Sequence, residues 1–287
     1  MRLKLKFTIG ISGLLLMFSC QIQNRSFQIQ NLTVEGRENF NALQESAPRL
    51  SWNSTSSKRN TVQQAYQIFV SSSKQNLQNG TADLWNSGKI QSSSSIDIKY
   101  AGAALQSHSK AYWKVKIWNS KGDSVTSPVN EWTMAMLKSE EWKAKWIGLE
   151  TFGKEDAPQR EQTRLSARYL RKEFKVNKKI LRATAFISGL GLYELYINGK
   201  KIGNDVLAPT ATDYNHKVPY NTFDVSANLK NGFNAIGVIL GNGRFFHMRD
   251  FQGKPSPITG IYHINYGFPR MIFQLRLEYA DGSIAYT

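Results

Sequence analysis

Apolar and polar residues alternate with a period of two along most of this chain. Tyr66, Ile68 and Val70 share one face of such a run, and residues 112–118 repeat the alternation. No window beyond the N-terminus keeps a helical period, so we expect strands throughout. About seven short strands over about 110 residues, separated by turns, are typical of a two-sheet sandwich. The expected strands of this half lie around residues 27–32, 50–52, 66–70, 96–100, 112–118 and 132–136.

The second half repeats the pattern with stronger turn signals. Asn198 and Gly199 follow an alternating run, and this pair favours a type I′ hairpin turn, whose two central residues need φ > 0. Asp281 and Gly282 form a second such pair. We therefore expect a second antiparallel sandwich, of the jelly-roll type. Its strands are expected near residues 169–176, 183–187, 193–197, 220–225, 234–240 and 271–279.

Two segments join or end these units. Residues 139–146 are short and charged, with Trp142 and Trp146 four positions apart, so we expect a linker whose aromatic side chains dock on both neighbours. Residues 283–287 begin a strand that should pair back after the second turn. Because a domain that stops there would leave an unpaired edge, we expect the chain to be a piece of a longer protein.

The N-terminus has the composition of an export signal. Arg2, Lys4 and Lys6 precede an apolar run over residues 7–18, which is shorter than the ~20 residues of a membrane-spanning helix. Cys20, the sole cysteine, closes the segment, which resembles the cleavage box of a bacterial lipoprotein. We predict lipid attachment at Cys20 after a signal segment of residues 1–20. The alternative is an ordinary cleaved signal with an incidental cysteine.

Composition and charge exclude several classes of protein. With 287 residues, 41% hydrophobic and 20% charged, the chain is long enough for two folded domains. A single cysteine excludes a disulfide framework and a cysteine-rich zinc site. The net charge of +16 divides into +3 in the signal, +5 over residues 21–140 and +8 over residues 141–287. Because the later positives alternate with apolar residues along strands, we expect no nucleic-acid partner.

Catalytic and cofactor motifs are not recognisable in this sequence. It has no Gly-x-Ser-x-Gly elbow, and its four histidines are far apart. The Gly-x-Gly stretches at 189–191 and 241–243 precede no helical pattern, so we interpret them as tight strand connections rather than phosphate loops. No carboxylate pair suggests a glycosidase dyad. We therefore assign no catalytic residue and no metal ligand, and expect no required cofactor.

One loop carries the mixture of side chains that sugar sites use. Residues 207–216 combine an acid, Asp213, an aromatic ring, Tyr214, and the amide of Asn215. Carboxylate and amide groups bind sugar hydroxyls, and a ring face packs against the C–H side. The alternative is a loop that folds on itself through turns made by its Asp and Asn side chains.

A second loop is a weaker candidate. Residues 241–250 contain Asn242, Arg244 and Arg249. The two arginines are suited to hold a carboxylate or a pair of hydroxyls, and equally suited to clamp a neighbouring domain. The predicted substrate-binding residues are thus Asp213, Tyr214, Asn242 and Arg244.

At this point the residues resemble a known family. Residues 194–199, 207–209 and 212–214, followed by 220–225, 234–243 and 279–283, are similar in order to the N-terminal β-sandwich domain of bacterial α-L-rhamnosidases. Residues 48–52, 66–68 and 112–115 resemble the fibronectin-type module that opens such enzymes. The resemblance implies an all-β chain with a fibronectin type III-like sandwich at 27–138. A jelly-roll, galactose-binding-like sandwich at 145–287, truncated at its C-terminal end, would follow.

The resemblance also implies a function. The family comprises secreted glycosidases that remove terminal α-L-rhamnose from plant polysaccharides or glycosides, by an inverting mechanism on a later helical barrel. That barrel would be the partner of this chain, which we predict to be inactive alone. Related modules bind rhamnose with calcium, but the sequence gives calcium no support here. Many members carry aromatics where Ala211 and Arg244 stand, so the resemblance does not imply a stacking platform.

Three functions remain open from the sequence. The first is the non-catalytic N-terminal portion of an exported α-L-rhamnosidase, helping in substrate recognition or domain packing. The second is a stand-alone surface lipoprotein that binds carbohydrate without cutting it. The third is an interaction scaffold. All three place the chain in the periplasm or at the surface of a bacterium, in contact with the membrane only through its lipid.

Overall fold

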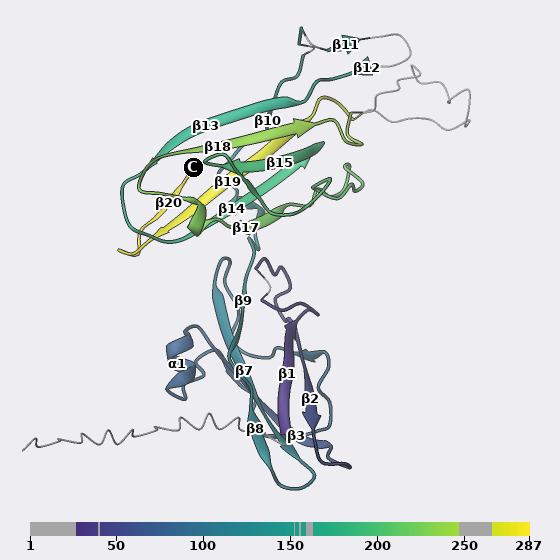
Figure 1. Cartoon of the computed structure of the whole chain (residues 1–287), viewed down its shortest axis with the longest axis vertical. Coiled ribbons are helices and arrows are strands. Elements are labelled where there is room, and N and C mark those ends of the chain that lie inside the picture. Colours follow the sequence, from purple (N-terminus) through teal and green to yellow (C-terminus); the bar gives the residue numbers. More distant parts are fainter. Residues whose placement is uncertain (1–26, 40, 152, 155, 159–162, 247–265) are drawn as a thin grey trace, which may run out of the picture.

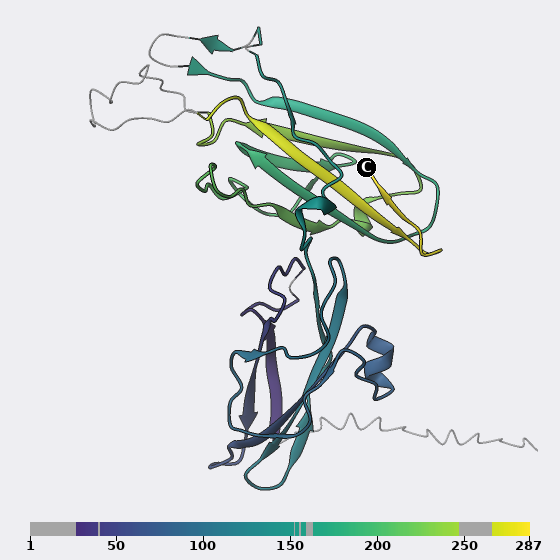
Figure 2. The ribbon, with the colours of Figure 1, turned by 180° about the vertical axis from the view of Figure 1, so that it is seen from behind.

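Two β-sandwiches, joined by a short linker, make up this protein. The computed structural model describes residues 27–287 apart from residues 40, 152, 155, 159–162 and 247–265. Figures 1 and 2 show the two sandwiches stacked along the long axis of the molecule. The signal segment and Cys20 lie outside the described residues. Within the described part of the chain, no helix is long and apolar enough to cross a membrane.

The first sandwich packs a three-stranded sheet against a six-stranded sheet. The small sheet has the order β1-β2-β6, and the large one has β4-β3-β7-β8 with β5 on β3 and β9 on β7. A single helical turn, α1 (Lys74–Gln78), lies beside β3 and is capped by the Ser73 side chain. The strands are β1 (Phe27–Val34), β2 (Arg49–Ser56), β3 (Gln63–Ser71), β4 (Trp85–Asn86), β5 (Ile90–Gln91), β6 (Ile98–Lys99), β7 (Lys110–Asn119), β8 (Ser124–Thr126) and β9 (Asn130–Thr133).

Alternation along β7 explains how its core forms. Ala111, Trp113, Val115 and Ile117 are all fully buried, while the residues between them are partly exposed. The core also contains Trp52, whose indole N–H donates to Gln63 Oε1 at 3.0 Å. Gln63 in turn donates to two backbone carbonyls, so this buried polar pair is satisfied within the sheet interface.

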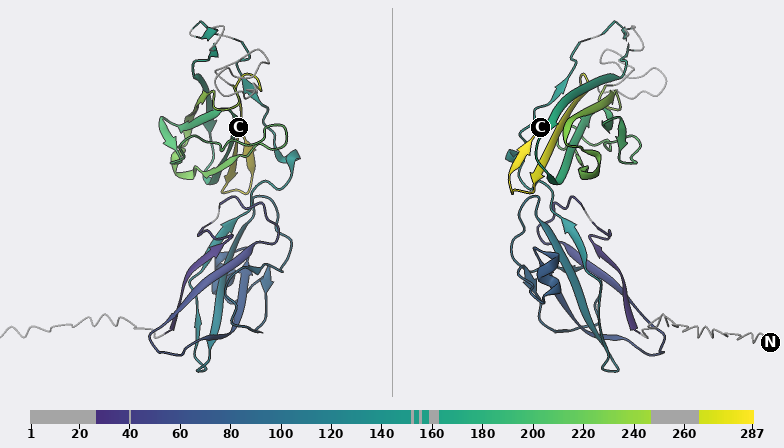
Figure 3. Two further views of the ribbon diagram at one scale, coloured as in Figure 1. Left: turned by 90° about the vertical axis from the view of Figure 1, so that its right-hand side faces the viewer. Right: turned by 60° about the vertical axis from the view of Figure 1, so that its left-hand side comes forward.

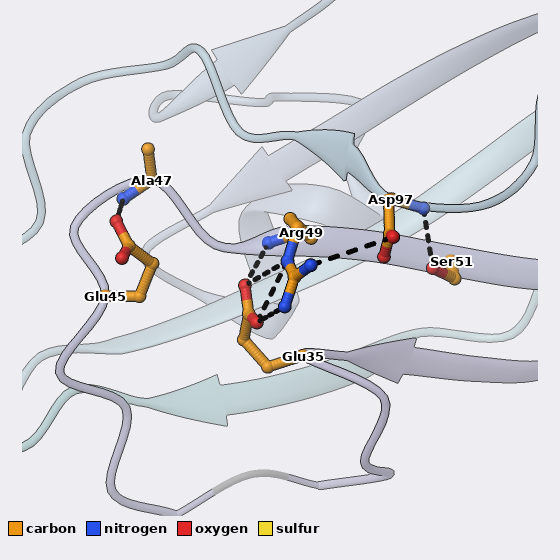
Figure 4. A network of polar contacts seen from close by, with 6 residues as sticks. All are labelled: Glu35, Glu45, Ala47, Arg49, Ser51 and Asp97. Atoms are coloured by element: carbon orange, nitrogen blue, oxygen red, sulfur yellow. Dashed lines mark hydrogen bonds and ion pairs between the residues drawn. The ribbon is translucent and has the colours of Figure 1, made fainter.

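An ion-pair network fastens one end of the small sheet. The Glu35 carboxylate, just after β1, accepts from Arg49 Nη2 at 2.6 Å and from the Arg49 backbone N–H at 2.7 Å (Figure 4). Asp97 lies 3.7 Å from the same guanidinium on the β6 side. The Arg49 side chain lowers the pKa of Glu35, but Arg49 is about half exposed. Solvent screens an ion pair this exposed, so it contributes little to stability and serves to align the strands.

The second sandwich packs two sheets of antiparallel strands. One has the order β10-β19-β14-β17 with β20 on β19, and the other β13-β18-β15-β16. A two-stranded ribbon of β11 (Ala157–Pro158) and β12 (Thr163–Arg164) precedes them. The remaining elements are β10 (Ile147–Gly148), β13 (Arg168–Val176), β14 (Ile180–Leu190), β15 (Leu192–Ile197), β16 (Lys200–Ile202), β17 (Asn221–Asp224), β18 (Gly232–Gly241), β19 (Arg270–Tyr279) and β20 (Ile284–Tyr286), with 3₁₀ turns η1 (Ser139–Glu141) and η2 (Ser226–Asn228).

The predicted turn at Asn198 and Gly199 is confirmed. Their φ angles are 51° and 81°, as a type I′ turn requires. The Asn198 side chain also accepts from the backbone N–H of Ala235 at 3.0 Å and donates to Asn234 Oδ1 at 2.9 Å. The turn is therefore tied to the neighbouring strand as well as to its own hairpin.

Four basic side chains lie on one edge strand. Among the described strands, β13 pairs only with β18, and it carries Arg168, Arg171, Lys172 and Lys175. Arg168 alone is withdrawn from solvent, where its guanidinium binds the Asp156 carboxylate at 2.5 and 2.9 Å. That pair lowers the pKa of Asp156.

One glutamine joins the linker to the second sandwich. Gln274 on β19 is buried, and its Oε1 accepts from the backbone N–H groups of Lys143 and Ala144 at 2.5 and 3.2 Å. Its Nε2 donates to the Glu141 carbonyl at 3.1 Å. The linker that leaves the first sandwich is thus hydrogen-bonded to both the oxygen and the nitrogen of one side-chain amide.

Aromatic rings pack around this crossing, where the side views show the sandwiches meeting (Figure 3). Phe186 is fully buried and meets Trp142 and Tyr220 edge-on, at centroid distances of 6.5 and 6.2 Å. His108, from the first sandwich, meets Phe186 at 5.3 Å. The Tyr220 hydroxyl donates to the Met136 carbonyl across the junction. Trp142 thus docks as expected, whereas Trp146 is 39% exposed.

One strand prediction needs correction. The run 96–100 forms only the short β6, and Ile96 is 69% exposed, because Asp97 has φ of 55° and interrupts the extended backbone. The strand expected to pair back after the second turn is confirmed: β20 pairs with β19, and Thr287 exchanges backbone hydrogen bonds with Leu275.

The turn geometry makes a prediction about two glycines. Gly199→Ala should destabilise the protein by about 1 kcal/mol, because an L side chain is strained at positive φ although no atom lies near its Cβ. The matched control is Gly237→Ala in β18, where the added Cβ meets only Tyr196 at an ordinary 3.8 Å. Urea unfolding curves should show the loss in the first variant and none in the second. Equal losses would contradict a backbone origin.

The junction makes a prediction about acid stability. Burial, followed by the nearby Arg276 charge, lowers the pKa of His108 from 6.5 to about 4. Between pH 6.5 and about pH 4, His108 therefore binds a proton in the unfolded chain but stays neutral in the folded chain. The contribution of neutral His108 to the free energy of unfolding should be fully present above pH 6.5 and lost as the pH falls towards 4.

Urea midpoints measured between pH 7 and pH 4 test this expectation. His108→Gln should have a shallower decline than the parent chain, because it removes the titrating group and leaves the carboxylates unchanged. Parallel curves for the two proteins would show that His108 contributes nothing to acid sensitivity.

Candidate functional site

The loop predicted to bind sugar runs between β16 and β17. It is anchored where the backbone N–H of Tyr193 on β15 donates to the Ala208 carbonyl at 2.8 Å. Leu207 has φ of 60°, and the following Ala208–Pro209 peptide is cis. Ala208 is buried against the core, so the segment after it leaves the sandwich from a fixed point.

Asp213 holds this loop together. Its Oδ1 accepts from the backbone N–H of Asn215 at 3.1 Å, which is an Asx turn, and its Oδ2 lies 2.8 Å from His216 Nδ1. Its carbonyl accepts from the backbone N–H groups of His216 and Lys217. Both carboxylate oxygens therefore have partners within the loop. The alternative interpretation, a loop folded on itself, accounts for this residue.

Tyr214 belongs to an aromatic cluster. Its ring lies edge-on to Phe245 and to Tyr266, each at 5.2 Å between centroids, and those two rings stack on each other at 5.8 Å. Burial raises the pKa of the Tyr214 hydroxyl, and the positive charge of Arg244 opposes that rise. The structure thus places Tyr214 beside Arg244, as the sequence grouped them. Its ring, however, packs against protein.

Asn242 is turned towards the protein as well. Its Nδ2 donates to the Leu165 carbonyl at 3.3 Å, and its own carbonyl accepts from the Phe246 backbone N–H. The two Gly-x-Gly stretches lie back to back, because a Cβ on Gly191 would stand 2.3 Å from the Gly241 carbonyl oxygen. The stretch at 189–191 is the tight connection from β14 to β15, as interpreted from the sequence, whereas the stretch at 241–243 only ends β18, since β19 begins at Arg270. Arg244 is exposed, and Arg249 lies outside the described residues.

The four predicted site residues therefore share one end of the second sandwich without forming an open site. Asp213, Tyr214 and Asn242 each have a structural contact, although the Asp213 side chain is still 59% exposed, and Arg244 is exposed as well. No group of three His, Cys, Asp or Glu side chains among the described residues could hold a metal ion. Of the residues at the junction between the sandwiches, the sequence pattern indicated only the linker aromatic Trp142. Tyr220 and Asn221 had drawn notice only as part of the family pattern.

Comparisons with known proteins match both sandwiches. Residues 29–138 match the family described as Rha78A-like, N-terminal immunoglobulin domain. Residues 178–286 match the alpha-L-rhamnosidase N-terminal domain. An alpha-L-rhamnosidase of Formosa agariphila is 33% identical over 283 residues, which cover 93% of this chain and 29% of the relative. One from Alteromonas sp. is 33% identical over 252 residues, or 26% of that relative. The chain thus spans under a third of these curated relatives.

Solved structures give the same result in three dimensions. The alpha-L-rhamnosidase from Dictyoglumus thermophilum superposes with a TM-score of 0.78 at 38% identity, over 91% of this chain and 28% of that one. The enzyme from Aspergillus terreus gives 0.74 at 27% identity, again over 28% of its length. The two sandwiches, in this order, therefore belong to the family of N-terminal domains found in α-L-rhamnosidases.

Proposed function

We propose that this chain is the non-catalytic N-terminal portion of an exported α-L-rhamnosidase that releases terminal α-L-rhamnose with inversion. The observation that carries the proposal is the match of both sandwiches to rhamnosidase N-terminal domains, within relatives about three times longer. Its partner is then a catalytic barrel supplied by the remainder of the enzyme. Its substrate is a rhamnose-containing plant polysaccharide or glycoside.

The role proposed for the chain is to pack on the catalytic part and to assist in substrate recognition. The junction supports a packing role, since Gln274, Phe186 and Tyr220 hold the two sandwiches in a defined arrangement. A rigid pair of domains can present a fixed surface to a third.

Export with a lipid on Cys20 is the proposal for localisation. It rests on the basic residues, the short apolar run and the position of the sole cysteine. The mature chain then sits in the periplasm or on the cell surface.

The proposal predicts no rhamnosidase activity in the chain itself. The purified protein of residues 1–287 should release no nitrophenol from a nitrophenyl α-L-rhamnoside, because the glycosidase dyad lies elsewhere in the enzyme. The Formosa agariphila alpha-L-rhamnosidase serves as the positive control for the assay. Release that scales with the amount of this chain, and survives repurification, would contradict the proposal.

The anchor is tested separately in a bacterial host. Cells fed a radioactive fatty acid should label the chain and retain it in the membrane fraction, since a thioether-linked lipid partitions there. Cys20→Ser should abolish both the label and the retention. Unlabelled parent protein recovered in the soluble fraction would favour an ordinary cleaved signal.

A further inference from the structure

A polar cleft lies where the first sandwich meets β17 of the second. It consists of two hollows of about 360 and 520 Å³, in the size range of small-ligand pockets. The hollows share Asn41, Thr222 and Phe223, so they form one continuous depression. We call it the junction cleft. One wall comes from residues 37–39, 41 and 42 of the first sandwich and the other mainly from β16, β17 and the loop between them.

Amides and carboxylates line this cleft at close spacing. The Asn221 Nδ2 donates to Asp205 Oδ2 at 3.0 Å, so this pair presents its remaining polar atoms together. Asn41 faces them from the first sandwich, lining both hollows. Planar side chains that both donate and accept are suited to adjacent hydroxyl groups.

Thr222 stands on the wall that the two hollows share. Its Oγ1 is buried and has no hydrogen-bond partner within the described part of the chain, and because this oxygen is closed to solvent a ligand in the cleft does not reach it. β17 is moreover an edge strand, paired only with β14, so its outer backbone groups face away from the ladder.

Two rings complete the lining. Phe223 is partly buried, and its edge packs so closely on Gly203 that a Cβ there would stand 2.6 Å from Cε1. Tyr220 lines the larger hollow, with its hydroxyl fixed by contacts to Gln44 and the Met136 carbonyl. Fixed aromatic rings beside hydroxyl-binding groups are suited to the apolar face of a sugar.

The charge of the lining discriminates between sugar classes. Three cationic side chains, Arg37, Lys200 and Lys201, stand against three carboxylates, Glu38, Asp205 and Asp224. A balanced lining gives no net attraction for a polyanion, because long-range steering depends on charge of one sign. The cleft therefore favours a neutral saccharide over a uronate or a sulfated one.

We propose that the junction cleft binds a neutral saccharide, using the polar side chains of Asn41, Asp205 and Asn221. This inference deepens the proposed function, on which its choice of sugar rests. It also moves recognition to the boundary between the sandwiches, away from the loop in which the Asp213 carboxylate and the Tyr214 ring have partners in the protein. Because both sandwiches supply walls, ligand binding depends on their relative placement.

Titration of the ¹⁵N-labelled whole chain with millimolar L-rhamnose tests the proposal. Amide signals of Asn41 and of β17 should shift. Asp205→Ala should weaken binding about tenfold, since it removes a carboxylate and leaves Asn221 without its partner. The matched control is Asn204→Ala, an exposed neighbour that lines neither hollow, and it should bind as the parent chain does.

Three results would overturn the proposal. These are shifts centred on Asp213 and Tyr214 that Asp205→Ala leaves intact, binding of D-galacturonate in place of rhamnose, and no shift at all with rhamnose. None of them bears on the hydrolysis assay, which decides the proposed function independently. Conversely, rhamnosidase activity of the chain would refute the proposed function. The amide chemical shifts would still report where the sugar binds.

Discussion

The arrangement of the whole molecule depends on the hydrogen bonds of one buried amide. Gln274 accepts from two linker N–H groups and donates to a linker carbonyl, so it replaces the strand partner that this segment lacks. These linker groups are only partly buried, and Gln274 gives each of them a partner inside the protein. The aromatic contacts of Phe186 then exclude water from the same region. Both walls of the junction cleft are held in place by this crossing.

The sequence predicted the sandwiches well because their cores follow local rules. β7 alternates strictly, and Asn198 with Gly199 can adopt the positive φ angles of their turn, so pattern and structure agree. The prediction was wrong at Ile96, since the positive φ of Asp97 depends on a hydrogen bond from its N–H to Ser51, 46 residues away. A hydrogen bond between residues so far apart in the sequence cannot be predicted from the local pattern of apolar and polar residues.

The candidate site shows the same limit more strongly. Asp213 and Tyr214 have the right chemistry for a sugar site. The Asp213 carboxylate, however, accepts a hydrogen bond within a local turn, and the Tyr214 ring packs against neighbouring rings. The cleft residues Asn41 and Asp205 are isolated polar positions in loops, separated by more than a sandwich in sequence. Only the docking of the two sandwiches brings them together. A site made by tertiary packing has no motif from which it could be predicted.

The basic side chains of β13 have a consequence for how this protein behaves among its own copies. A free edge strand of nine residues offers a backbone template to any second chain with a similar edge. Arg171, Lys172 and Lys175 lie along that template, and although Arg171 is paired with Glu173 on the same strand, the charge of the edge remains positive in excess. Two such edges would repel each other. We therefore expect these side chains, which first suggest a surface for binding polyanions, to limit self-association through this edge.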